Sequence, residues 1–213
     1  MQMEEMTKLF FDKISSYNIF NNLYPGVIFC YSLKIMFDRN IIQDSWIENI
    51  IMFYFVGMIL SRIGSIIIEP TMKKIKLKGK TVMHFVPYVD YEKACKVDPM
   101  VAVLSETNNI YRSLLTCFLC TLLFKVYNDI IKLCFAGNEP SFIKANWEWI
   151  ILIFLIVLFT FSYIKQTTYV GERVISIIDK TEHRECDINK EKISNDDSSQ
   201  AAKAKDIKFK ERL

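Results

Sequence analysis

The sequence predicts an all-α integral membrane protein, built as a four-helix bundle with cytoplasmic helical extensions. Three features support this fold class: four long apolar segments, positive charges gathered on one side of those segments, and a polar C-terminal portion. Over 213 residues, the chain is 51% hydrophobic and 24% charged, which are ordinary totals for a soluble protein. The arrangement of the charges, rather than their number, therefore indicates a membrane protein.

Each apolar segment is long enough to cross a bilayer, which needs about 20 apolar residues in a helix. We expect the first span in the N-terminal part, 1–37, where residues 14–33 carry no charge and the preceding residues form an interfacial segment. The other three spans are predicted at 46–68, 109–127 and 147–165. The run 151–161 is apolar on every face, which is unusual for a helix of a soluble protein.

The positive charges predict the orientation. Twenty Lys and Arg residues lie before the first span, in the middle loop or from Lys165 onward, and three lie in the two short connections. Because Lys and Arg collect on the cytoplasmic side, we expect a multi-pass protein of the cell inner membrane with both termini in the cytoplasm. The three tryptophans then lie at the outer interface, where an aromatic belt is expected.

The cytoplasmic parts are predicted to be partly folded. Residues 69–108 contain a basic loop and a helical insert, and Asp98 followed by Pro99 is a good start for a helix that runs into the third span. The fourth helix is expected to continue over 166–185, with an apolar stripe that needs a partner. Residues 186–213 are rich in Ser, Asp and Lys and are predicted to be disordered.

Polar side chains near the inner end of the spans form the main candidate site, because such residues are costly at membrane depth. Arg62 and Glu69 are seven residues apart, roughly on one helix face. One interpretation is a polar clamp that fixes packing, and the other is a vestibule, ion path or lipid-headgroup site. This membrane polar cluster comprises Asn18, Asn21, Asn22, Arg62, Glu69, Glu106, Asn108, Asn109 and Arg112.

Small residues follow one face of the second span, namely Gly57, Ser61, Gly64 and Ser65. Small residues at this spacing let transmembrane helices approach closely, so we expect this face to form a homo-oligomer interface. In the first span, Pro25 removes one backbone donor, which predicts a kink.

A basic run follows the second span, formed by Lys73, Lys74, Lys76, Lys78 and Lys80. Lysines beneath a membrane are attracted to anionic membrane lipid. An alternative is that they only set the orientation of the helices.

The sequence contains no pattern typical of a catalytic triad, a nucleotide loop or a metal cluster, and we expect no enzyme activity and no cofactor. Cys117 and Cys120 lie within the third span, where they are interpreted as small buried hydrophobes. No basic and aromatic platform for direct nucleic acid binding is evident.

Four strings, at 16–26, 61–70, 104–112 and 162–170, resemble a group of small four-span bacterial inner-membrane proteins. In size and layout the chain is also similar to the membrane subunit of the Kiwa antiphage defence system. That resemblance implies a membrane sensor of phage attack that works with a cytosolic, DNA-binding partner protein. It implies no catalytic residue.

Taken together, these features predict a non-enzymatic, oligomeric sensor or tether that acts with a cytosolic protein partner, with a role in antiviral defence. The alternative is a pore-forming effector that depolarises the cell, in which Asn21, Asn22 and Arg62 line a channel between copies.

Overall fold

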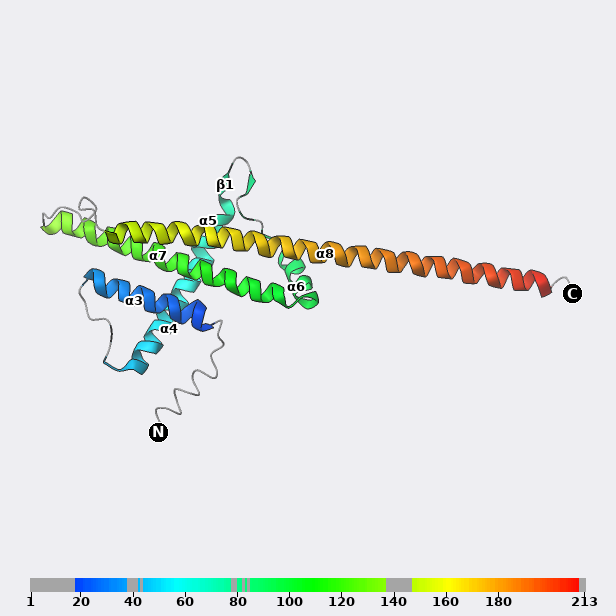
Figure 1. The fold of residues 1–213 in the computed structure, drawn as a ribbon, viewed down its shortest axis with the longest axis horizontal. Helices are drawn as coiled ribbons and strands as arrows, with labels where there is room; N and C mark the ends of the chain where they lie inside the picture. Colours follow the sequence, from blue (N-terminus) through cyan, green and yellow to red (C-terminus); the bar gives the residue numbers. More distant parts are fainter. Residues whose placement is uncertain are drawn as a thin grey trace, which may run out of the picture. The chain divides into compact units, whose positions relative to one another are not determined.

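The computed structural model describes residues 18–37, 42, 44–77, 80, 81, 83, 85–136 and 147–210. Apart from one short hairpin, the described elements are helices (Figure 1). They are, in chain order, η1 (Ile19–Leu23), α3 (Tyr24–Phe37), α4 (Trp46–Ile63), η2 (Gly64–Ile68), α5 (Glu69–Lys74), α6 (Tyr88–Val97), α7 (Met100–Ala136) and α8 (Trp147–Lys210). The hairpin pairs β1 (Lys76–Leu77) with β2 (Lys80–Thr81) in antiparallel register. The all-α prediction is confirmed.

Three of these helices are long and apolar enough to cross a membrane: Trp46–Lys74, Met100–Ile131 and Trp147–Arg184, with mean hydropathies of 2.0, 1.6 and 2.1 over their most apolar windows. They contain the predicted second, third and fourth spans. The helix formed by η1 and α3 is not among the three. Its asparagines, Pro25 and Lys34 lower its hydropathy, and residues 1–17, which include the predicted interfacial segment, lie outside the described chain.

Two helices contain a single widened π turn, and in each a proline lies two residues after the turn ends. In η1 the backbone N–H of Tyr24 donates to the carbonyl of Ile19, five residues back. In η2 the N–H of Glu69 donates in the same way to Gly64. A π turn accommodates one extra residue, and here it precedes Pro25 and Pro70, which cannot donate a backbone hydrogen bond. The helix continues past Pro70 to Lys74.

The described chain divides into two compact units. The first comprises described residues of Met1–Phe85 and Ala102–Val170, and the second those of Val86–Val101 and Gly171–Leu213. In the first unit, α7 packs on both sides: Cys117 meets Phe29 and Leu60, whereas Leu114 and Phe118 meet Leu152 of α8. A third cluster joins Met72 and Met83 to Leu115 and Tyr163.

The second unit contains α6, the start of α7 and the later part of α8. Asp98 caps α7 by accepting a 3.0 Å hydrogen bond from the backbone N–H of Met100, as the sequence predicts. The same carboxylate accepts two hydrogen bonds from Arg173, at 2.6 and 2.9 Å. Val174 is fully buried, so one residue of the apolar stripe predicted on α8 is covered within this unit.

The C-terminal prediction is wrong. Residues 186–210 continue α8 as one helix, in contrast to the disordered portion expected over 186–213. The physical reason lies in the composition: from Glu172 to Lys210 the sequence contains neither glycine nor proline, and it includes many Lys, Glu and Ala residues, which favour helices. Low hydrophobicity alone does not end a helix that is already nucleated upstream.

Candidate functional site

Asn21 is the centre of a buried polar contact among three helices. Its side-chain nitrogen donates to the Ser61 hydroxyl of α4 at 3.1 Å and to the side-chain oxygen of Asn22 at 2.9 Å. Its own side-chain oxygen accepts a 2.8 Å hydrogen bond from Ser113 of α7. Of the predicted cluster, Asn21 and Asn22 meet here, and the partners on α4 and α7 are Ser61 and Ser113, which the prediction did not include. Such a contact between helices is consistent with a packing clamp.

The backbones of η1, α3 and α4 approach so closely that only glycine fits at two positions. A Cβ atom on Gly57 would lie 1.5 Å from the carbonyl oxygen of Asn22, and one on Gly26 would lie 1.8 Å from that of Phe53. On the other side, a Cβ on Gly64 would lie 2.5 Å from the Thr116 hydroxyl of α7. These contacts lie within one chain.

This packing corrects the predicted homo-oligomer interface. Gly57, Ser61 and Gly64 are used inside the protomer and are not available to a second copy, while Ser65 is half-buried. The reason is that close packing of small residues operates equally well between helices of the same chain. Asn21 and Asn22 are likewise buried within the protomer.

Glu69 is the centre of a second polar contact. One carboxylate oxygen accepts from the Arg112 guanidinium at 2.5 Å, and the other pairs with Lys73 at 2.7 Å. The Arg112 side chain is only 12% exposed and that of Glu69 is 23% exposed. The ammonium of Lys73 also lies 4.3 Å from the centre of the Phe85 ring. Glu69 thus joins α5 to α7, and Lys73 joins this pair to the segment that follows the hairpin.

Arg62 does not join the cluster. It is exposed, and Glu69 pairs with Arg112 instead. In a regular helix the seven residues from Arg62 to Glu69 would return to about the same face. The extra residue of η2 turns the helix by about 100°, so the two side chains diverge by about 120°. The shared face predicted from spacing is therefore wrong.

Buried polar atoms adjoin the Glu69–Arg112 pair. Tyr163 of α8 is completely buried, and its hydroxyl interacts electrostatically with the charges of Arg112 and Glu69. Within the described residues, neither this hydroxyl nor the Nε of Arg112 meets the geometry of a hydrogen bond. Met72, Met83 and Leu115 pack around the same tyrosine, so its surroundings are largely apolar.

Asn108 takes part in a contact between α7 and α8. Asn108 accepts a 2.9 Å hydrogen bond from Thr167, and the amide of Gln166 donates to the carbonyl of Leu104 at 3.1 Å, so both contacts clamp α7 to α8. Asn18 and Asn109 are half-buried, whereas Glu106 is exposed.

The lysines of the basic run differ in their surroundings. Lys73 is engaged by Glu69 and Phe85, and Lys74 is exposed. Lys76 and Lys80 lie on the two strands, and Lys78 lies outside the described residues.

The ion pair between Lys125 and Glu148 was not predicted from the sequence. The Lys125 ammonium of α7 is 2.6 Å from the carboxylate of Glu148 and 5.3 Å from the centre of the Trp149 ring, and its side chain is 9% exposed. Along α7, Arg112 and Lys125 are 13 residues apart, or about 20 Å, which is less than the roughly 30 Å of a bilayer core. Two features of the sequence could have indicated this pair: Lys125 is a single lysine in an apolar helix, and Glu148 lies next to Trp149 at the start of the following helix.

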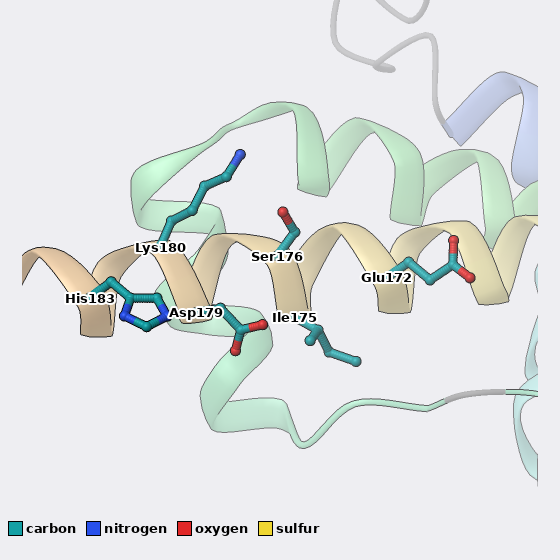
Figure 2. A pocket seen from close by; sticks show the side chains of 6 residues that line it. All are labelled: Glu172, Ile175, Ser176, Asp179, Lys180 and His183. Carbon is teal, nitrogen blue, oxygen red and sulfur yellow. The ribbon is translucent and has the colours of Figure 1, made fainter.

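A shallow depression lies along α8 in the second unit, and Figure 2 shows the side chains that line it. Its lining comes from a single helix: Glu172, Ile175, Ser176, Asp179, Lys180 and His183. Among the residues that the structure describes, no group of three or more His, Cys, Asp or Glu side chains is placed to hold a metal ion.

Comparison of the chain with protein-family models, with curated proteins and with solved structures finds no match. The functional argument therefore depends on the contacts described above.

Proposed function

We propose that this protein is a non-enzymatic sensor or tether of a bacterial inner membrane, which couples its membrane helices to a cytosolic protein partner. A role in antiphage defence is suggested by the similarity in size and layout to the membrane subunit of the Kiwa system. Homo-oligomer formation remains part of the proposal, through a surface other than the small-residue face of α4.

The observation that carries the proposal is the continuity of α8. One helix of 64 residues includes both the apolar run that begins at Trp147 and the polar residues beyond Gly171. Sharp bends in helices arise mainly at proline, glycine or π turns, and α8 has no proline and a single glycine. A partner bound to the polar part of such a helix is mechanically connected to the membrane segment.

The clamp between α7 and α8 supports the same proposal. Thr167 and Gln166 hold α8 against Asn108 and the Leu104 carbonyl at the point where the apolar run gives way to the polar one. A change in packing among the membrane helices is therefore passed to α8 through hydrogen bonds, which have a defined geometry.

We further propose a four-span bundle with both termini in the cytoplasm. The helix of η1 and α3 packs against α4 and α7 through Gly26, Gly57 and Asn21, as expected for a member of a bundle. The twenty-to-three distribution of Lys and Arg supports the orientation. A phosphatase fused after Leu213 should be inactive, and a fluorescent protein fused there should fold; an active phosphatase would overturn the orientation.

Site-specific photo-crosslinking in cells tests the tether. A photoreactive residue is placed at Asp179 or His183, which are exposed on the polar part of α8, and as a control at Ile153 or Phe154, which are exposed on the apolar part. We expect the same soluble protein adduct from both polar positions and none from the apolar ones. Absence of that adduct, together with depolarisation of cells that express the protein, would favour the pore instead.

A further inference from the structure

A basic segment without acids of its own follows the apolar part of the helix formed by α4, η2 and α5. Between Glu69 and Asp90 the sequence contains five lysines and no aspartate or glutamate. Glu69 itself is engaged, because it pairs with Arg112 and with Lys73. Lys74 is exposed and makes no ion pair with any residue that the structure describes. This stretch of chain therefore supplies no counter-charge for Lys74 or for the lysines that follow it.

The hairpin keeps two further lysines near the end of α5. β1 begins at Lys76, two residues after α5 ends at Lys74. The antiparallel register then places Lys80 opposite Leu77, so the chain turns back toward the helix instead of leading away from it. Lys74, Lys76 and Lys80, which we call the lysine end, thus belong to one small region of the structure. Like charges gathered in this way repel one another unless anions lie among them.

The helix that carries the lysine end has the length needed to reach lipid headgroups. Its 29 residues, Trp46–Lys74, rise about 42 Å. A bilayer measures about 30 Å across its hydrocarbon core and about 40–45 Å with its headgroup regions. Tryptophan collects at membrane interfaces, so Trp46 at one interface leaves Lys74 at the opposite one.

Exposed isoleucines precede the lysine end on the same helix. Ile66 and Ile67 are 72 and 55% exposed, about two turns before Lys74. An anionic phospholipid presents the matching order of chemistry, namely acyl chains followed by a phosphodiester. A soluble nucleic acid or an acidic protein surface would match the lysines but not the isoleucines.

We propose that Lys74, Lys76 and Lys80 bind the phosphodiesters of anionic membrane phospholipids, whose acyl chains lie against Ile66 and Ile67. Basic residues next to a membrane segment attract anionic headgroups, and a lysine ammonium acts on a phosphate as a point charge. Lys73 is not part of this site, because Glu69 and the Phe85 ring engage its ammonium. The proposal is independent of the cytosolic partner of α8.

Lipid retention tests the site. The full chain is extracted by detergent from vesicles of equal phosphatidylglycerol and phosphatidylcholine, and the phospholipids that stay bound are counted by native mass spectrometry. We expect phosphatidylglycerol to be enriched. Each lysine near an anionic membrane adds about a fivefold preference, so Lys74→Gln should lower the enrichment about fivefold. The triple variant Lys74→Gln, Lys76→Gln, Lys80→Gln should retain the two lipids equally.

A matched variant removes the same charge elsewhere. Lys180→Gln, Arg184→Gln and Lys190→Gln change cations of α8 that lie at least 15 residues, or about 22 Å, beyond Lys165. This α8 variant should keep the enrichment of the unmodified protein. Because Lys74 is exposed, Lys74→Gln should leave thermal unfolding unchanged, which separates lipid binding from folding.

Four outcomes would overturn the proposal. The unmodified protein could retain both lipids equally, or the triple variant could keep the full enrichment. An equal loss of enrichment in the triple variant and the α8 variant would show an effect of net charge alone. Finally, displacement of the bound phosphatidylglycerol by excess glycerophosphoglycerol, which is the headgroup without acyl chains, would show that the lysines take a soluble phosphate.

Discussion

The hydroxyl of Ser113 donates a 2.8 Å hydrogen bond to the side-chain oxygen of Asn21, which is 92 positions earlier in the chain. Since Asn21 also donates to Ser61, one amide connects η1, α4 and α7. Interhelical hydrogen bonds in membranes contribute about 0.6 kcal/mol on average and up to about 1.7 kcal/mol each. The contact is therefore a measurable part of bundle stability.

Replacing Asn21 with alanine should lower the free energy of unfolding by about 1–3 kcal/mol, because two interhelical hydrogen bonds are lost. Unfolding by SDS in mixed micelles, followed by circular dichroism, measures the change. Ser32→Ala is the matched control, since Ser32 donates only to the carbonyl of Ile28 in its own helix, at 2.8 Å. It should stay within about 0.5 kcal/mol of the unmodified protein. Equal effects of the two substitutions would contradict the clamp.

Gly57→Ala should destabilise the chain more than Gly64→Ala. The new methyl group at position 57 would meet the backbone carbonyl of Asn22, which cannot move away, whereas at position 64 it meets the side chain of Thr116, which can rotate. Overpacking costs about 1–3 kcal/mol, and we expect Gly57→Ala at or above the upper end. Thermal unfolding in detergent provides the measurement. If Gly57→Ala abolished self-association without lowering thermal stability, this face of α4 would be an interface between copies after all.

Glu69→Gln should be more damaging than Arg112→Gln. Without Glu69, the guanidinium of Arg112 remains largely buried without its carboxylate, and a broken buried pair costs about 3–5 kcal/mol. Without Arg112, Glu69 keeps its second cation, Lys73. Both variants are compared by SDS unfolding, with Lys74→Gln as a control because Lys74 is exposed. The opposite order of stability would show that Lys73 does not compensate.

The Asp98 contact should make the second unit sensitive to acid. Hydrogen bonds from Arg173, and then from the backbone N–H of Met100, lower the pKa of this carboxyl below its ordinary value of 3.8. A lowered pKa stabilises the fold above 3.8, and this stabilisation disappears as the pH falls through the folded-state pKa. Carboxyl resonances of Asp98 followed by NMR should titrate lower in the unmodified protein than in Arg173→Gln. Identical titrations in the two proteins would rule out the contact.

Much of the fold was predictable from the sequence because long apolar runs have few alternatives. The start of α7 next to Asp98 and the continuation of α8 past Lys165 both follow from local signals, namely a capping acid and an unbroken helical pattern. The helical state of residues 186–210 is not evident from composition, because a segment rich in Ser, Asp and Lys is typical of disorder.

The candidate site was predictable as a set of residues but not as a set of pairs. Asn21, Glu69 and Arg112 were identified from their depth, which sequence position determines. Which residues pair depends on how each helix is rotated about its axis. The extra residue of η2, between α4 and α5, changes the direction in which the side chains of α5 point relative to those of α4. Lys125 does not stand out in the sequence, because it lies near the end of a predicted span. Its partner Glu148 is on the next helix, and this pairing is evident only in the structure.

The unbroken course of α8 has a mechanical consequence. Within the polar segment beyond Gly171, a rotation about the helix axis would present a different face to whatever is bound there. Each residue of a helix is turned by about 100° from the one before it. A partner bound to one face of this segment would therefore exchange its contacts when the segment turns about its own axis.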